Sequence, residues 1–111
     1  MHDVYRIEIT EPAERDLQDA VKYIVIELKN RIAADRLLDD VDKAVYSLKE
    51  MPSRHALVDD EILSGQGVRF IPVLNYLVFY AIREEIKTVV LERFLYSRRD
   101  WVTILRGENE L

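Results

Sequence analysis

The sequence contains no cysteine, two histidines, three glycines and three prolines. Without cysteine the chain has neither disulfide bonds nor thiolate metal ligands, which suits a reducing compartment, so we expect a cytoplasmic protein. The low glycine and proline content excludes collagen-like and linker-rich sequences. No apolar run of about 20 residues is present, and we expect no membrane span. The first ten residues lack a basic region followed by an apolar run, and no secretory signal is expected.

The chain has 111 residues, of which 49% are hydrophobic and 33% charged. This length suits one compact domain, so residues 1–111 are interpreted as a single domain. The net charge of −5 disfavours general binding of nucleic acid, which needs a basic field to release counterions. A local basic surface remains open, because the C-terminal part contains Arg69, Arg83, Lys87, Arg93, Arg98 and Arg99.

The N-terminal third predicts a strand followed by a helix. Residues 4–9 alternate apolar and polar side chains, which indicates a strand with Tyr5, Ile7 and Ile9 on one face. Thr10 suits the N-cap of a helix, and Pro12 suits its first turn. Apolar residues then recur at helical spacing: Ala13, Leu17, Ala20, Val21, Ile24 and Leu28.

A second amphipathic helix is predicted after a break at Asn30. Its apolar stripe has a repeat of three and four residues and ends before Met51-Pro52. The short connection between the two helices predicts an antiparallel helical hairpin. Residues 53–66 show no sustained period and are interpreted as a loop with at most one short element.

Three strands and a short helix are predicted for the C-terminal part. Pro72 indicates that the first strand, residues 68–73, lies at an edge or contains a bulge. The second strand, residues 76–83, is apolar on both faces, so both faces are expected to be covered. The third strand covers residues 88–96. Ser97 is the predicted cap of the final helix, with Asp100 at its third position.

These elements define an α+β domain with the order β-α-α-β-β-β-α. We expect an N-terminal strand, an antiparallel helical hairpin, a three-stranded antiparallel meander and a short C-terminal helix. The sheet is expected to be mostly antiparallel and to pack against the helical hairpin.

Two stretches resemble a known family. The first stretch, residues 69–80, has the sequence RFIPVLNYLVFY. It resembles the family's pattern of a strand with an arginine, a tight turn ending in Asn-Tyr and a strand ending in Phe-Tyr. LYSRRDW, residues 95–101, is similar to the final-strand signature of the same family. Together with the order of elements, they resemble the RelE/ParE superfamily toxins of type II toxin–antitoxin systems, of the plasmid stabilisation type. The resemblance implies a toxin that arrests growth and a cognate antitoxin that neutralises it by wrapping the sheet or the helical hairpin.

The family contains two activities. RelE-like members cut messenger RNA in the ribosome, whereas ParE-like members inhibit DNA gyrase. In the nuclease branch the position of Leu77 carries a basic residue. That branch also has a catalytic His or Tyr near or within the C-terminal segment, whereas this sequence has no His or Tyr after Arg99. RNA cleavage needs a base and an acid as well as positive charge, and both His2 and His55 lie outside the strand region. The sequence therefore favours the ParE-like branch and inhibition of gyrase by binding, without bond chemistry.

The alternative from the enzyme class is a ribosome-dependent mRNA endoribonuclease with an atypical site. A third possibility is a non-toxic partner that binds the antitoxin and serves in regulation. No catalytic residue is assigned, and neither a cofactor nor a metal is expected, since Asp59-Asp60-Glu61 is better interpreted as a solvated loop. The candidate target-binding residues are Arg69, Arg93, Tyr96, Arg98 and Arg99.

Each candidate also has a structural interpretation. Arg98 and Arg99 oppose the helix dipole at the predicted helix start, so an anionic partner would explain them; otherwise they are solvated, with Asp100 pairing one of them. Arg93 either joins Arg69 in a basic patch or forms a cross-strand ion pair. Tyr96 is either exposed at the site or an ordinary aromatic at the sheet edge. Trp101 is interpreted as a packing residue.

Overall fold

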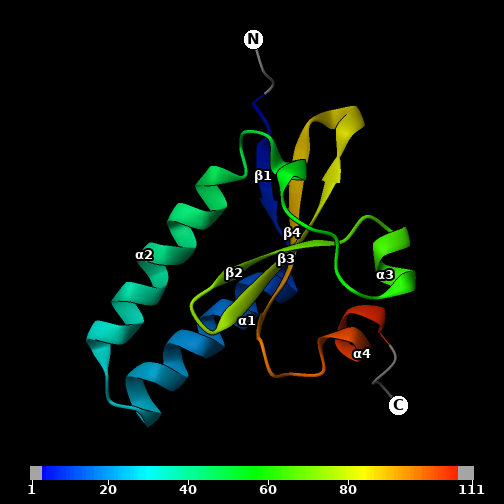
Figure 1. Cartoon of the computed structure of the whole chain (residues 1–111). Helices are drawn as coiled ribbons and strands as arrows, with labels where there is room; N and C mark the ends of the chain where they lie inside the picture. Colours follow the sequence, from blue (N-terminus) through cyan, green and yellow to red (C-terminus); the bar gives the residue numbers. More distant parts are fainter. Residues whose placement is uncertain (1–3, 108–111) are drawn as a thin grey trace.

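Four strands form one mixed sheet in the order β1-β4-β3-β2 (Figure 1). The computed structural model describes residues 4–107. The strands are β1 (Arg6–Ile9), β2 (Arg69–Val73), β3 (Tyr76–Arg83) and β4 (Thr88–Tyr96). Strands β2, β3 and β4 form the predicted antiparallel meander, and β2, which contains Pro72, lies at an edge as predicted. Strand β1 forms the other edge and runs parallel to β4.

The helices confirm the predicted order of elements. Helix α1 (Glu11–Lys22) continues into a π-helical turn, η1 (Tyr23–Glu27), and connects to α2 (Arg31–Ser47). Helix α3 (Glu61–Gly65) is the short element within the predicted loop, and α4 (Trp101–Arg106) follows the sheet. Two 3-10 turns, η2 (Pro52–Arg54) and η3 (Glu84–Ile86), complete the fold. No helix within residues 4–107 is long and apolar enough to cross a membrane.

The first helix begins as the sequence predicts and ends differently. The Thr10 hydroxyl accepts a hydrogen bond from the Ala13 N–H at 3.2 Å. At the other end, the Leu28 N–H reaches back five residues to the Tyr23 carbonyl at 3.2 Å. This wider turn inserts a residue into the helical repeat and rotates the residues that follow. The prediction that Leu28 continues the buried stripe is therefore wrong, because its side chain is 56% exposed.

The sheet is covered on both faces, as the apolar β3 strand predicts. On one face, Leu37 and Val41 of α2 pack with Val78 and Tyr80 of β3. On the other face, Phe79 belongs to a second cluster that includes residues of α3 and α4. Phe79 and Tyr80 are both 0% exposed, which is possible because consecutive strand residues point to opposite faces.

The start of α4 corrects one prediction. Ser97 does not cap the helix, because the chain turns tightly after β4 and the Arg99 N–H donates to the Tyr96 carbonyl at 2.9 Å. Asp100 is the N-cap instead, and its carboxylate accepts hydrogen bonds from the N–H and the hydroxyl of Thr103. The helix therefore begins at Trp101, three residues later than a Ser97 cap would place it.

Tyr80→Phe is expected to lower the free energy of unfolding by about 1–2 kcal/mol. The buried Tyr80 hydroxyl donates to the Pro52 carbonyl at 2.5 Å and ties η2 to the sheet. Burial raises the pKa of Tyr80 to about 12, so the hydroxyl stays protonated as a donor. Urea unfolding measures the effect. Tyr46→Phe is the control, since Tyr46 is 70% exposed. Equal stability of the two variants would show that the Tyr80 bond contributes nothing.

Candidate target-binding surface

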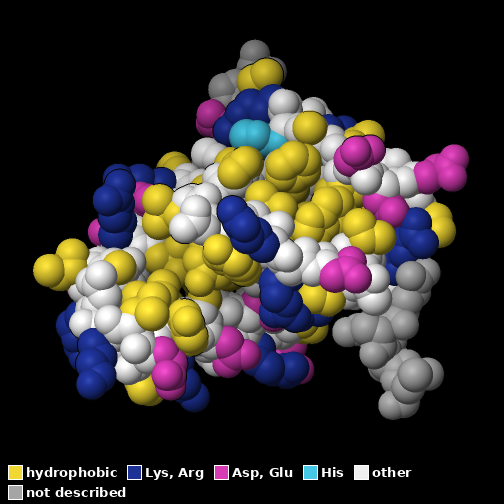
Figure 2. Space-filling model, turned by 60° about the horizontal axis from the view of Figure 1, so that its bottom comes forward, with side chains coloured by type: hydrophobic (Ala, Val, Ile, Leu, Met, Phe, Trp, Pro, Cys, Tyr) yellow, Lys and Arg dark blue, Asp and Glu magenta, His cyan; other side chains and the backbone are white. Residues whose placement is uncertain are grey.

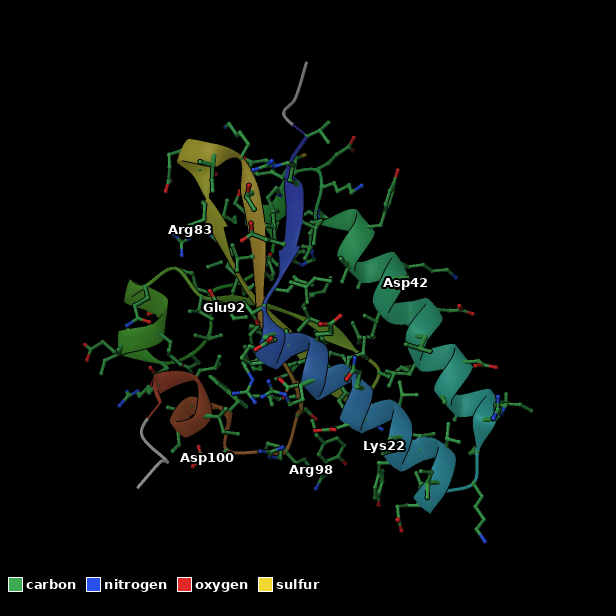
Figure 3. The ribbon with its side chains drawn as sticks, turned by 180° about the vertical axis from the view of Figure 1, so that it is seen from behind. Lys22, Asp42, Arg83, Glu92, Arg98 and Asp100 are labelled. Atoms are coloured by element: carbon green, nitrogen blue, oxygen red, sulfur yellow. The ribbon has the colours of Figure 1, made fainter. Side chains whose placement is uncertain are left out.

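Three candidate residues meet where β4 leads into α4. The Ser97 N–H donates to the Asn75 carbonyl at 2.9 Å, which fixes this turn against the β2–β3 connection. Tyr96, Arg98 and Arg99 are all exposed. Figure 3 shows Arg98 in the connection and Asp100 at the start of α4. Within residues 4–107, neither arginine side chain makes a hydrogen bond or ion pair, and the Asp100 carboxylate is engaged by Thr103 instead. Both guanidinium groups are therefore available to an external anionic group.

A hollow of about 840 Å³ lies beside this turn. Its wall combines tyrosines and aliphatic residues with Arg99, and it includes Tyr23, Leu28, Leu74, Tyr76 and Tyr96. Figure 2 shows hydrophobic side chains exposed on this side of the molecule, with Lys and Arg side chains among them. Exposed apolar surface flanked by charges is typical of protein-binding sites.

Three aromatic residues of the hollow, Tyr76, Phe94 and Tyr96, are held by ring contacts with one another. Tyr76 stacks on Phe94 with ring centroids 4.7 Å apart, and Tyr96 meets Tyr76 edge-on at 5.7 Å. Burial raises the pKa of Tyr76, and the neighbouring Tyr96 and Tyr23 add to this shift. The Tyr76 hydroxyl is therefore neutral at physiological pH. Rigid aromatic side chains lose little entropy on binding, so they suit a contact surface.

Tyr23, Leu28 and Leu74 belong to this surface and were not predicted as members of it from the sequence. They come from η1, from the connection to α2 and from the β2–β3 turn, which are distant in sequence. Leu28 is exposed because of the π-helical turn, and Leu74 because it occupies the tight turn with a φ of 54°. The sequence assigned Leu28 to a buried stripe and Leu74 to the tight turn before Tyr76, and no pattern in it related these residues to one surface.

Arg93 is bound within the protein and does not form a cross-strand ion pair. Its guanidinium contacts both carboxylate oxygens of Asp16 in α1, at 2.7 and 2.9 Å. The Phe94 N–H also donates to Asp16, at 3.1 Å. The hydrogen bond from Arg93 to Asp16 raises the pKa of Arg93. The Asp16–Arg93 ion pair lies next to the register shift between β3 and β4. Asp16 therefore connects α1 to an irregular part of the sheet.

Arg69 lies at the start of β2 and is likewise engaged. Its Nη1 donates to the carbonyl of His55 at 2.6 Å. The His55 ring also meets the Tyr80 ring edge-on, with centroids 6.4 Å apart. His55 lies in a loop outside the strands, as the sequence predicts, and it is only partly exposed. The contact joins residues 14 apart in sequence and depends on the bridge between Leu57 and Arg69.

His55 is held in its neutral form. Burial lowers its pKa below the usual value of 6.5, and the charges of Arg54 and Arg69 add to this effect. Its Nε2 atom is buried and has no hydrogen-bond partner within the described part of the chain. Protonation of this ring would place a third positive charge beside two arginines, so the folded state resists it.

The unfolding temperature is expected to fall as the pH drops from 7 towards 5, and to fall less in His55→Gln. Unfolded chains bind a proton at His55 near pH 6.5, whereas the folded chain binds it only at lower pH. The stabilisation is therefore complete above pH 6.5 and is lost as the pH falls through the lowered pKa. Thermal unfolding followed by circular dichroism at several pH values measures this difference. Identical pH profiles would refute the role of His55.

The acidic stretch before α3 has a structural role. Asp60 caps α3 by accepting from the Leu63 N–H, and its carboxylate also pairs with Arg106 of α4 at 2.7 Å. The hydrogen bond from Arg106 lowers the pKa of Asp60. Among residues 4–107 no group of three or more His, Cys, Asp or Glu side chains could hold a metal ion. The Asp60–Arg106 pair thus links the two short helices that cover the second core.

Residues 7–101 match the family described as the ParE toxin of the type II toxin–antitoxin system parDE. The match covers most of the chain, and it includes the strand that carries Arg69 and the turn that carries Arg98 and Arg99. The chain therefore belongs to the ParE toxin family, within the RelE/ParE superfamily that the sequence resembles. No curated protein matches the sequence.

Two solved structures share the fold. One belongs to a chromosomal ParDE toxin–antitoxin system from P. aeruginosa, with a TM-score of 0.67 and 18% identity over 84% of this chain and 96% of that chain. The other belongs to the toxin–antitoxin complex RelBE2 from Mycobacterium tuberculosis, with a TM-score of 0.58 and 23% identity over 85% of this chain and 92% of that chain. At these identities the likeness concerns the fold.

Proposed function

We propose that the chain is a toxin that arrests growth by binding DNA gyrase and that a cognate antitoxin neutralises it. The observation that carries this proposal is the turn after β4, where Arg98 and Arg99 are exposed and unpaired within residues 4–107 beside the tyrosine-lined hollow. Two free guanidinium groups next to rigid aromatic side chains suit recognition of an anionic protein surface. Membership of the ParE toxin family supports the choice of gyrase.

The second face of the sheet also favours binding over catalysis. Phe79 and Leu95 are buried there beneath α3 and α4, and Leu77 packs against the same cluster. The Asp60–Arg106 ion pair joins α3 to α4 over this face of the sheet. An apolar core offers no polar groove for RNA, and Leu77 contributes no charge at the position where nuclease members of the superfamily are basic. Besides the two arginines, the titratable groups at this turn are Tyr96 and Asp100, and the Asp100 carboxylate caps α4.

A supercoiling assay with purified gyrase tests the proposal. Refolded chain is titrated into gyrase and relaxed plasmid, and loss of supercoiling or accumulation of cleaved plasmid is expected. The matched control is Arg36→Ala/Arg83→Ala, which removes two exposed arginines elsewhere on the surface and keeps the net charge equal to that of Arg98→Ala/Arg99→Ala. The control should inhibit like the original chain, and the Arg98/Arg99 variant should not. Unchanged supercoiling activity of gyrase at micromolar concentrations of the chain would overturn the proposal.

The surroundings of His55 favour a second candidate function, ribosome-dependent cleavage of mRNA. A neutral imidazole beside Arg54 and Arg69 provides a base and positive charge in one place. Burial of the Nε2 atom argues against this role, because a base must reach the hydroxyl it deprotonates. His55→Gln separates the two functions. A gyrase inhibitor keeps its toxicity in this variant, whereas a nuclease that uses His55 loses it.

A further inference from the structure

The connection between β2 and β3 contains a residue that its backbone conformation does not favour. Val73 pairs with Tyr76 across the two strands, so Leu74 and Asn75 form a two-residue hairpin loop. Leu74 has a φ of 54°, in the left-handed region that glycine and asparagine adopt readily and that is strained for leucine. Two-residue hairpin loops accordingly prefer Gly, Asn or Asp. The backbone conformation therefore does not explain a leucine at this position.

Burial does not explain this leucine either. The Leu74 side chain is 51% exposed and belongs to neither hydrophobic cluster of the described chain, whereas the neighbouring Val73 is 4% exposed and lies in the core. Within residues 4–107, the other non-glycine residues with positive φ are Lys29, Met51 and Lys87, and none of them lines the hollow beside the turn after β4. Leu74 does line it. Backbone strain is often retained at positions that bind a partner, which makes Leu74 a candidate contact residue.

Exposed apolar side chains from separate segments surround the same hollow. Tyr23 of η1 and Leu28 of the connection to α2 are 54% and 56% exposed. Leu74 joins them from the β2–β3 turn, which Figure 1 shows beside α1. The stacked rings of Tyr76 and Phe94 lie in the wall as well. A hollow of about 840 Å³ with this lining has room for a bulky apolar side chain of a partner.

The positive charge at the hollow is concentrated in the turn after β4. Arg99 lines the hollow, and Arg98 precedes it in the same turn. Of the two aspartates in the wall, Asp16 is neutralised by Arg93, whereas Asp19 is exposed. The Asp19 carboxylate disfavours a nucleic acid, whose phosphates it would repel. A protein segment is favoured if acidic side chains beside its apolar anchor meet the two arginines.

We propose that the hollow receives one bulky apolar side chain from an acidic segment of the target and that Leu74 is the principal anchor on the toxin. The side chain of the target packs against Leu74 and the tyrosines of the hollow, and carboxylates next to it pair with Arg98 and Arg99. The two arginines thus orient the segment, whereas Leu74 supplies the apolar contact that selects it. This inference rests on the proposed function, because it describes the part of gyrase that the toxin recognises.

The substitution Leu74→Asn separates binding from folding. Asparagine tolerates the left-handed conformation, so the unfolding temperature of the variant should equal that of the original chain or exceed it by up to about 4 °C. A leucine that serves only the fold would instead lower the unfolding temperature when it is replaced. Half-inhibition of gyrase supercoiling should require at least tenfold more of the variant, and growth arrest after induction should weaken.

Two matched variants serve as controls. Leu74→Met keeps an apolar side chain of similar volume and should inhibit gyrase within about threefold of the original chain. Ile86 in η3 is 52% exposed and does not line the hollow. Ile86→Asn therefore removes an apolar side chain of comparable exposure from another part of the surface, and both inhibition and growth arrest should be unchanged.

The possible outcomes distinguish the inference from the proposed function. Inhibition and growth arrest by Leu74→Asn equal to those of the original chain would overturn the anchor and leave the proposed function standing. If the original chain itself leaves supercoiling unchanged, the proposed function fails, and growth arrest by Leu74→Asn then decides whether Leu74 anchors the target. Size-exclusion chromatography and antitoxin binding test other occupants. A dimer that is lost in Leu74→Asn, or loss of antitoxin binding with growth arrest retained, would place another chain in the hollow and overturn the inference.

Discussion

Replacing Arg98 and Arg99 together with alanine is expected to abolish growth arrest and to leave the fold intact. Both side chains are exposed and make no hydrogen bond or ion pair within residues 4–107, so their loss removes no internal contact. Truncation of an arginine that is a hot spot of an interface costs about 2 kcal/mol or more, which is roughly a thirtyfold loss of affinity. Growth after induction without antitoxin measures the effect.

The fold of this variant must be checked in the same experiment. Its unfolding temperature should lie within about 2 °C of the original, since surface substitutions usually change stability by less than 0.5 kcal/mol. The variant Arg36→Ala/Arg83→Ala should still arrest growth, which excludes a general effect of charge. Undiminished toxicity of a folded Arg98→Ala/Arg99→Ala variant would show that the turn after β4 is not the binding surface.

Asp16→Asn is expected to lower the free energy of unfolding by about 2 kcal/mol, and the unfolding temperature by roughly 10 °C. The substitution keeps the size of the side chain and removes its charge. Arg93 then loses one of its two hydrogen bonds to a carboxylate and its neutralising partner, although its side chain is only 27% exposed. Leaving a partly buried charge unpaired costs more than the pair itself contributes.

A double-mutant cycle with Arg93→Gln measures the interaction directly. The two substitutions together should cost less than the sum of their separate effects, by at least 1 kcal/mol. Asp19→Asn, at an exposed position on the same helix, should change stability little and serves as the control. Additive effects of Asp16→Asn and Arg93→Gln would mean that the pair does not stabilise the fold and that Arg93 is available for another role.

The fold followed from the sequence wherever a periodic pattern and a turn signal agreed. Both long strands, β3 and β4, have the predicted bounds, and the Thr10 cap and the edge position of β2 are confirmed. The end of α1 was not predictable in this way, because a π-helical turn has no distinct pattern of apolar residues. Ser97 and Asp100 both suit a helix cap, and only the tight turn after β4 decides between them.

The surface was predicted less completely than the fold. The sequence grouped Tyr96, Arg98 and Arg99, which are adjacent in the chain. It did not reveal that Asp16 occupies Arg93 or that the His55 carbonyl occupies Arg69, because both contacts join distant segments. Side chains of identical type thus differ in availability, and this difference depends on tertiary contacts that no local pattern encodes.

The most direct test of gyrase as the target is pulse-labelling of DNA and protein synthesis in the first minutes after induction without antitoxin. If the chain inhibits gyrase, incorporation of thymidine falls first, while incorporation of methionine continues. Early loss of methionine incorporation with continued DNA synthesis would contradict gyrase as the target and would point to cleavage of mRNA.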